Sequence, residues 1–197
     1  FLVRAHYRRV RQLLSSLDDV LTNLPMPEPK KPPELGPDGP TAIVLVESYA
    51  GLGIHTLLSI QRLFPRHFKN FVFSSVGLVD SGQFKGVNDV EALEDKVRVD
   101  LEKYVQFANR MGYYAEYRMT LGTDLIAELE GQCHDLIKEF RRPVVFAGQL
   151  VFQRENVFTR SLHHETSFSI QRRLQFTGIQ VIILPIRVWE RRRAPRT

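Results

Sequence analysis

The sequence predicts an α/β domain built on a five-stranded parallel sheet with helices on both faces. Five short apolar runs recur after residue 40, at 41–46, 71–76, 113–119, 144–147 and 181–184. Each of the first four is followed by a stretch with helical spacing of apolar residues. A parallel neighbour is reached only through a crossover, usually a helix, so this alternation favours a parallel sheet. The 197 residues are enough for one such domain and an appendage.

The first 40 residues are expected to stand outside the domain, as a juxtamembrane amphipathic helix at 1–24 and a linker at 25–40. Apolar residues repeat at alternating steps of four and three, namely at Val3, Tyr7, Val10, Leu14, Leu17, Leu21 and Leu24. Such a helix either lies on its own domain or packs with something upstream, and both interpretations stay open. The linker holds seven of the eleven prolines, which favour a semi-rigid extended spacer.

The domain itself is expected at 41–189, followed by a basic tail at 190–197. The expected strands are 41–47, 71–79, 113–119, 143–147 and 179–186, and the first and last helices are 52–63 and 166–177. Asn88 is expected to cap a long helix that leaves through Gly112. Thr123 is expected to cap the next helix, whose shared apolar face consists of Leu125, Leu129, Cys133, Leu136 and Phe140.

The net charge of +5 comes from the two ends of the chain. Residues 1–11 and 187–197 hold nine of the 27 basic residues and one of the 22 acidic ones, so 12–186 carry 18 bases and 21 acids. A nucleic-acid-binding domain places its basic residues on a folded face, so no nucleic-acid partner is expected. Basic ends fit an anionic membrane surface. No apolar run approaches the roughly 18–20 residues that cross a bilayer.

Two further features bear on the context of the chain. It opens with Phe1 rather than Met, so we expect a piece of a longer polypeptide. Its one cysteine, Cys133, excludes an internal disulfide and falls on the apolar phase of a predicted helix. We therefore expect a buried, unreactive thiol and a reducing compartment.

Doubly wound sheets bind ligands at the carboxyl ends of their strands, so the candidate ligand residues are those expected at these ends. Gly51-Leu52-Gly53 is a fragment of the dinucleotide fingerprint, but Thr56 stands where the third glycine would be, and a plain tight turn is favoured. The segment 152–164 is long for a connection. The candidate ligand residues are Glu47, Ser48, Asp80, Gly148, Arg154, Arg160, Thr166 and Ser167.

No pattern typical of metal binding or catalysis accompanies these residues. His163 and His164 are adjacent, so they point apart on either a helix or a strand. Ser48 follows a strand without the glycine-flanked elbow of a nucleophile, and a hydrolase would need turnover that is lost when Ser48 is replaced. We expect no metal, no cofactor and no catalytic activity.

Residues 41–186 resemble the universal stress protein domains. The stretch Thr166-Ser167-Phe168-Ser169, leading through Arg173-Leu174 to 181–184, is similar to the Gly-Ser, helix and final strand of that family. The resemblance implies five parallel strands, frequent dimerisation and, in some members, ATP bound by a glycine-rich loop after strand four. Here the sequence from Gly148 lacks the family's Gly-x-x-Gly, Thr166 replaces a later glycine, and Glu47 replaces an Asp. Glycine lets the backbone approach phosphates, so ATP bound in the family's manner is not expected.

The start of the chain carries a second resemblance. His6-Tyr7-Arg8-Arg9-Val10, after apolar 1–3, is similar to the segment past the last membrane helix of bacterial amino acid–polyamine–organocation permeases. This implies a non-catalytic regulatory and dimerisation domain of an amino acid or cation permease, at the cytoplasmic face of the bacterial inner membrane. Its partners would be the membrane-spanning part of the same polypeptide and a second copy. The expected dimer interface is the last strand and its exit, with Val181, Ile183, Pro185 and Trp189. The alternative is a stress sensor that binds ATP, AMP or a cyclic dinucleotide.

Overall fold

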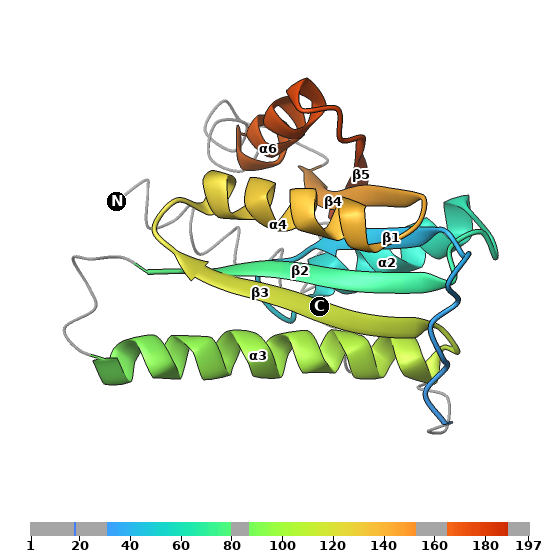
Figure 1. Cartoon of the computed structure of the whole chain (residues 1–197), viewed down its shortest axis with the longest axis horizontal. Helices are drawn as coiled ribbons and strands as arrows, with labels where there is room; N and C mark the ends of the chain where they lie inside the picture. The colour runs from blue at the N-terminus through green and yellow to red at the C-terminus, as the bar shows by residue number, and fades with distance from the viewer. Residues whose placement is uncertain (1–17, 19–30, 80–86, 153–164, 189–197) are drawn as a thin grey trace, which may run out of the picture.

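A computed structural model describes residues 18, 31–79, 87–152 and 165–188 (Figure 1). Strands and helices alternate along these residues. Their order is β1 (Thr41–Leu45), α2 (Gly51–Leu63), β2 (Asn70–Leu78), α3 (Val87–Arg110), β3 (Tyr114–Gly122), α4 (Leu125–Glu139), β4 (Pro143–Phe152), α6 (Glu165–Phe176) and β5 (Val181–Val188). The alternation predicted from the sequence is confirmed.

The five strands form one parallel sheet in the order β3-β2-β1-β4-β5. β1 lies at the centre, where Leu45 is in register with Ser74 of β2 and with Ala147 of β4. The chain first builds the sheet to one side of β1 and then crosses to the other, so the strand order reverses between β1 and β4. This is the doubly wound arrangement, and it confirms the expected fold class.

Helices cover both faces of the sheet (Figure 1). α2 and α3 share one buried cluster with the sheet, and α4 and α6 share the other. Successive residues of β1 therefore enter opposite clusters, with Ala42 and Val44 on the α2 side and Ile43 on the α4 side. A strand buried on both faces needs apolar residues at every position, which is why these strands have continuous apolar runs.

Two strands are longer than the sequence predicted. β3 runs to Gly122, and β4 runs to Phe152 rather than ending at residue 147. The last five residues of β4 have passed the end of β1 and pair with β5 alone, from Gly148 opposite Leu184 onward. Gly148 was expected in a loop after strand four; it lies instead within the strand. A glycine and a glutamine interrupt the apolar run here, and pairing with β5 continues the strand through them.

Two predicted helix caps are wrong. Asn88 lies inside α3, after Val87, so it does not cap that helix. α4 is capped by Asp124 rather than Thr123, since the Asp124 carboxylate accepts hydrogen bonds from the backbone N–H groups of Ile126 at 3.0 Å and Ala127 at 3.1 Å. Thr and Asp are both favourable caps, and pattern alone does not choose between neighbours.

Two glycines end helices as the sequence indicated. Gly112 after α3 has φ +87° and Gly178 after α6 has φ +85°. This left-handed backbone conformation strains any residue with a Cβ atom and is usual after a helix.

The cap of α4 gives a direct prediction. Replacing Asp124 with Ala is expected to lower the free energy of unfolding by about 1 kcal/mol, because two N–H groups of the first turn lose their acceptor. Thr123→Ala is the matched control and is expected to change stability far less. Urea unfolding of both variants measures the difference, and equal effects would contradict the assignment of the cap.

Candidate functional site

The switch point between β1 and β4 is the place where sheets of this kind receive ligands. The turn from β1 to α2 lies there, and it carries two of the predicted residues, Glu47 and Ser48. Both are exposed. Their carbonyl groups hold the turn in place, since the Glu47 oxygen accepts from the Ser75 hydroxyl at 3.3 Å and the Ser48 oxygen accepts from the Tyr104 hydroxyl at 2.8 Å.

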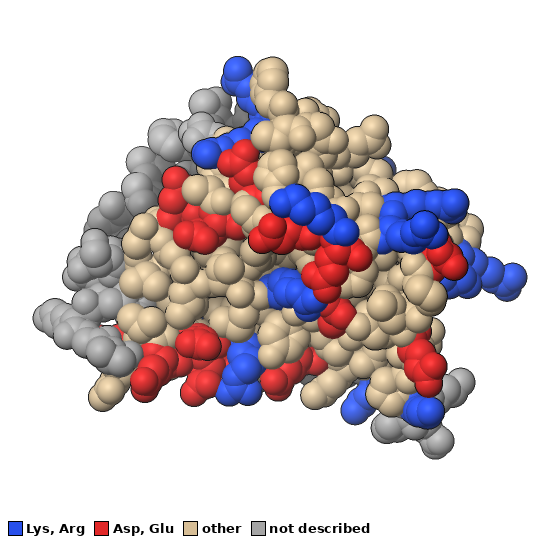
Figure 2. All heavy atoms as spheres, in the orientation of Figure 1, with Lys and Arg blue, Asp and Glu red and all other residues tan. Residues whose placement is uncertain are grey.

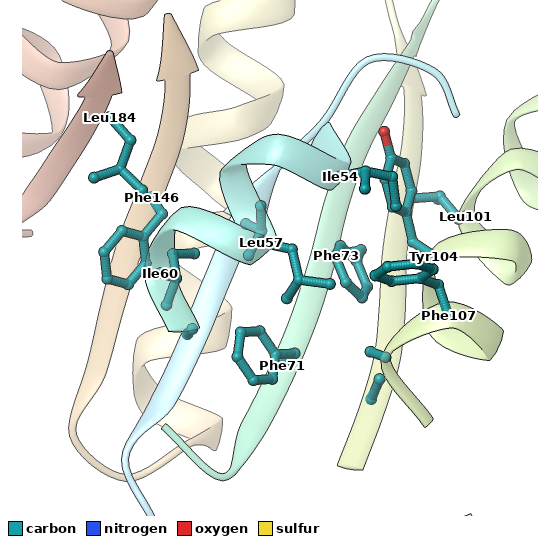
Figure 3. Packing of buried hydrophobic residues seen from close by; sticks show 14 of the residues in the cluster. Ile54, Leu57, Ile60, Phe71, Phe73, Leu101, Tyr104, Phe107, Phe146 and Leu184 are labelled. Atoms are coloured by element: carbon teal, nitrogen blue, oxygen red, sulfur yellow. The ribbon is translucent and has the colours of Figure 1, made fainter. Parts of the chain in front are cut away.

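Tyr104 of α3 reaches into this turn from the α2 face of the sheet. Its hydroxyl oxygen accepts from the Ala50 N–H at 3.1 Å, in addition to donating to Ser48. The ring stacks on Phe73 with centroids 5.0 Å apart and meets the edge of Tyr49 at 4.9 Å. Figure 3 shows the ring next to Phe73 and Ile54. Burial raises the pKa of the Tyr104 hydroxyl far above its ordinary value. The phenol therefore stays protonated and keeps its hydrogen bonds to Ser48 and Ala50.

Gly53, the second glycine of the dinucleotide-like fragment, makes room for this tyrosine. A Cβ atom at Gly53 would lie 2.1 Å from the Tyr104 hydroxyl oxygen and 2.6 Å from the ring carbon that bears it. Only glycine allows the ring to come this close to α2. The fragment thus serves packing at the start of α2, in agreement with its interpretation as a tight turn.

Gly148 serves a similar purpose on the other side of the switch point. A Cβ atom there would lie 2.2 Å from the Thr56 hydroxyl oxygen and 3.1 Å from Leu52 Cδ1. Thr56 is buried, and its hydroxyl donates to the Leu52 carbonyl at 2.8 Å. α2 therefore packs directly on the backbone of β4 at Gly148, with a threonine side chain filling the space.

The structure places three of the predicted ligand residues near one another. The side chains of the other five lie outside the part of the chain that it describes. Glu47, Ser48 and Gly148 all lie just beyond the paired residues Leu45 and Ala147. Thr166 and Ser167 lie in the first turn of α6, and their side chains are outside the described part of the chain. The ligand candidates Asp80, Arg154 and Arg160 lie entirely outside the described residues, as does Trp189 of the expected dimer interface.

A polar network on the opposite face of the sheet was missed by sequence reasoning. Gln132 of α4 is buried, and its side-chain oxygen accepts from the Ser74 hydroxyl at 2.5 Å. Its side-chain nitrogen donates to the Ser75 carbonyl at 3.2 Å and to the Thr120 hydroxyl at 3.0 Å. The network joins α4 to β2 and β3. A glutamine within the apolar phase of a helix is the signal that points to it.

One contact at the turn was also missed. The N–H of Gly51 donates to the carboxylate of Asp18 at 2.7 Å, across 33 residues. The available signal was the start of α2, because Ala50 at its N-cap offers no side-chain acceptor. The first N–H groups of a helix need partners from elsewhere when the helix does not supply its own.

Charges on the face that carries α3 and α4 are mixed (Figure 2). On α3, Arg98 pairs with Asp95 at 2.7 Å. Between elements, Arg118 of β3 pairs with Glu139 of α4 at 2.6 Å. Both signs are interspersed, and basic side chains are matched by acids. This face lacks the single-sign field that draws a polyanion.

Within the described ranges, no group of three or more His, Cys, Asp or Glu residues is placed to hold a metal ion. The helices of those ranges include none that is both long and apolar enough to cross a membrane. Cys133 has no exposed surface, and burial raises the pKa of its thiol to about 12. The expected buried thiol is confirmed.

These observations define a doubly wound α/β domain whose switch point is packed with its own side chains. No family model and no curated protein matches the sequence. A crystal structure of a protein from the universal stress protein family from Burkholderia pseudomallei is similar to this chain, with a TM-score of 0.49 and 17% sequence identity. The match covers 73% of this chain and 96% of that one.

The tie made by Tyr104 can be tested by removing its hydroxyl group. Tyr104→Phe is expected to lower the free energy of unfolding by about 0.5–1.5 kcal/mol, because partly buried backbone groups of the turn lose their partner. Tyr113→Phe is the control, since Tyr113 contacts Phe71 through its ring, and its hydroxyl has no hydrogen-bond partner among the described residues. Urea unfolding should separate the two variants. If Tyr104→Phe is as stable as the control, the hydroxyl does not hold the turn.

The buried thiol gives stability a dependence on pH. Folding raises the pKa of Cys133 from 9.0 to about 12, so in this range the unfolded chain releases a proton that the native state keeps. This contribution is complete below pH 9 and is lost as the pH rises toward 12. Above about pH 9, unfolding free energy should fall more steeply for the wild type than for Cys133→Ala, by up to about 1.4 kcal/mol per pH unit. Parallel curves would show that the thiol does not titrate in this way.

Proposed function

We propose that this chain is a non-catalytic regulatory and dimerisation domain of a bacterial permease for amino acids or cations. It would stand at the cytoplasmic face of the inner membrane, joined to the membrane-spanning part of the same polypeptide. Three sequence features support this assignment: the permease-like segment at 1–10, the proline-rich spacer at 25–40 and the basic residues at both ends.

The observation that carries the regulatory role is the packing of the switch point. Sheets that bind nucleotides leave space beside their glycines, so that the backbone approaches the phosphates. Here the space beside Gly53 holds the Tyr104 ring, and the space beside Gly148 holds Thr56. At the switch point α3 therefore packs on α2, and α2 packs on β4. Such direct packing suits a domain that passes on its position or assembly state as a rigid body. It favours this role over the nucleotide sensor.

The proposed dimer uses the open edge of the sheet at β5. Ile183 is half-buried and Pro185 is exposed, so both are available to a second copy. Val181 is 5% exposed and packs against the α4 and α6 side, so its side chain serves the core rather than a partner. Trp189, outside the described residues, stays a predicted contact.

The membrane assignment is tested by the gene that encodes this chain. The reading frame upstream of Phe1 is expected to encode about a dozen stretches of roughly twenty apolar residues, as a permease requires. A start codon close to Phe1 would refute the assignment.

Light scattering of the purified chain should show a dimer, and a monomer at every concentration would refute dimerisation.

The nucleotide alternative is separated by thermal shift with ATP, AMP and cyclic dinucleotides. A ligand that binds only the native state raises the melting temperature, and at 100 times its dissociation constant it adds about 2.7 kcal/mol of stability. We expect no rise at millimolar concentration. A rise with one nucleotide would replace the regulatory proposal with the sensor.

A further inference from the structure

The sheet has a basic end, where the parallel strands begin and the helices stop. The residues that close each helix and lead into the next strand are 60–69, 107–113, 136–142 and 173–180. Together they contain one acid and eight bases, which are Arg62, Arg66, Lys69, Arg110, Lys138, Arg141, Arg142 and Arg173. The linker residues 31–40 add one base and two acids, of which Asp38 pairs with Arg141 at 2.5 Å. Figure 2 shows basic side chains gathered on the right, where the strands of Figure 1 begin.

The opposite end of the sheet is acidic. The described residues between each strand and the first turn of the next helix contain no base and five acids, which are Glu47, Asp89, Asp124, Glu128 and Glu165. Acids favour helix N-termini and bases favour helix C-termini, and parallel strands make all four helices point the same way. The helix dipole therefore accounts for bases in the last helical turns, such as Arg62 and Arg173. It leaves the bases of the loops to be explained.

Three loop bases lie around the point where the linker enters the sheet. The first residue of β1 is in register with the first residues of β2 and β4, so Lys69 and Arg142, which precede those two strands, flank Pro40. The Lys69 N–H donates to the Pro40 carbonyl at 3.2 Å. Both side chains are exposed, as is that of Arg66, and none of the three has an ion-pair partner among the described residues. Unpaired like charges repel one another, so this end of the domain favours an anionic partner.

Two of these bases occupy backbone positions that favour glycine. Arg66 has φ +60° and Arg142 has φ +47°, and they are the two non-glycine residues with positive φ in the described ranges. The turns after α3 and α6 use Gly112 and Gly178 instead. A left-handed conformation costs a residue with a Cβ atom free energy that glycine avoids. Folding alone therefore does not explain arginine here. A strained, charged and exposed residue indicates a contact made outside the domain.

Exposed apolar side chains occur at the same end of the sheet. Leu63, the last residue of α2, is 54% exposed, and Phe176, the last residue of α6, is 83% exposed. The Arg172 guanidinium lies over the Phe176 ring, 6.0 Å from its centroid. Bases together with exposed aromatic and aliphatic side chains are typical of surfaces that bind the headgroup layer of an anionic membrane.

We propose that the basic end of the domain, with Arg66, Lys69 and Arg142 at its centre, binds the phosphate and carboxylate groups of an anionic phospholipid membrane. The linker enters at this end, so an upstream segment held in a membrane brings the basic end toward the lipid and points the acidic end away. This orientation rests on the proposed function, whereas affinity for lipid is a property of the domain itself. The sequence conceals the surface, because its residues come from separate turns and residues 12–186 contain more acids than bases.

Vesicle binding by the full chain tests the surface. Arg66→Gly combined with Arg142→Gly removes two charges at positions where glycine is the less strained residue, so the fold is kept. A base near an anionic surface contributes about fivefold in affinity, so this double variant should bind vesicles of equal parts phosphatidylcholine and phosphatidylserine about thirtyfold more weakly. Lys96→Gln combined with Arg187→Gln is the matched control, since it removes the same charge from exposed positions outside the basic end. If the two double variants bind alike, or the wild type does not bind, the proposal is wrong.

A fluorescent label tests which end meets the lipid. Gln175→Cys at the basic end and Thr123→Cys at the acidic end each receive an environment-sensitive fluorophore, and Cys133 is buried, so the introduced thiol is the accessible one. With the phosphatidylserine vesicles, emission from position 175 should shift to shorter wavelength, and emission from position 123 should not. Phosphatidylcholine alone, or raised salt, should abolish the shift, because the attraction is between charges.

A shift at both positions or at neither, or binding of single-stranded RNA in place of vesicles, would overturn the proposal. A start codon close to Phe1 would refute the permease and leave the measured vesicle binding unchanged, so the two proposals fail separately.

Discussion

The hydroxyl group of Tyr104 joins α3 to the turn between β1 and α2, through Ser48 and Ala50. The position of α2 follows from this tie, because Gly53 lets the ring lie against the helix. α2 then packs on β4 where Gly148 faces Thr56. The helices α2 and α3 and the strands β1 and β4 are thus fixed relative to one another. A methyl group at Gly53 or Gly148 would disrupt these contacts. The turn between β1 and α2 is therefore held in place by the packed interior, although Glu47 and Ser48 on it are exposed.

Two separate buried clusters maintain the sheet, one on each face. The cluster beneath α2 and α3 is rich in aromatic side chains, and Phe146 meets Phe68 edge to face at 5.3 Å. The cluster beneath α4 and α6 has smaller apolar residues and admits Gln132 with its hydroxyl partners. An amide in a core is tolerated only when its donors and acceptor are paired, so this network also fixes the register of α4.

The fold could be predicted from the sequence because a strand that is covered on both faces of the sheet must be apolar throughout. Each such strand therefore appears in the sequence as a continuous apolar run. Details set by contacts between distant residues were not readable. The end of β4 depends on pairing with β5, so Gly148 looked like the start of a loop. The site was harder still. Glycines that pack against side chains and glycines that meet phosphates look alike in sequence, and only the place of Tyr104 separates them. The cap from Asp18 spans 33 residues, which no local pattern reports.

The outer strand β5 carries Pro185, which has no backbone N–H. The Gln180 carbonyl accepts from Val145, and alternation along the strand then turns the Pro185 nitrogen away from β4, toward solvent. Proline is tolerated in a sheet at such a position. Because a strand interrupted in this way is a poor template for further strands, a second copy would meet β5 through side chains such as Ile183 and Pro185 rather than by continuing the sheet.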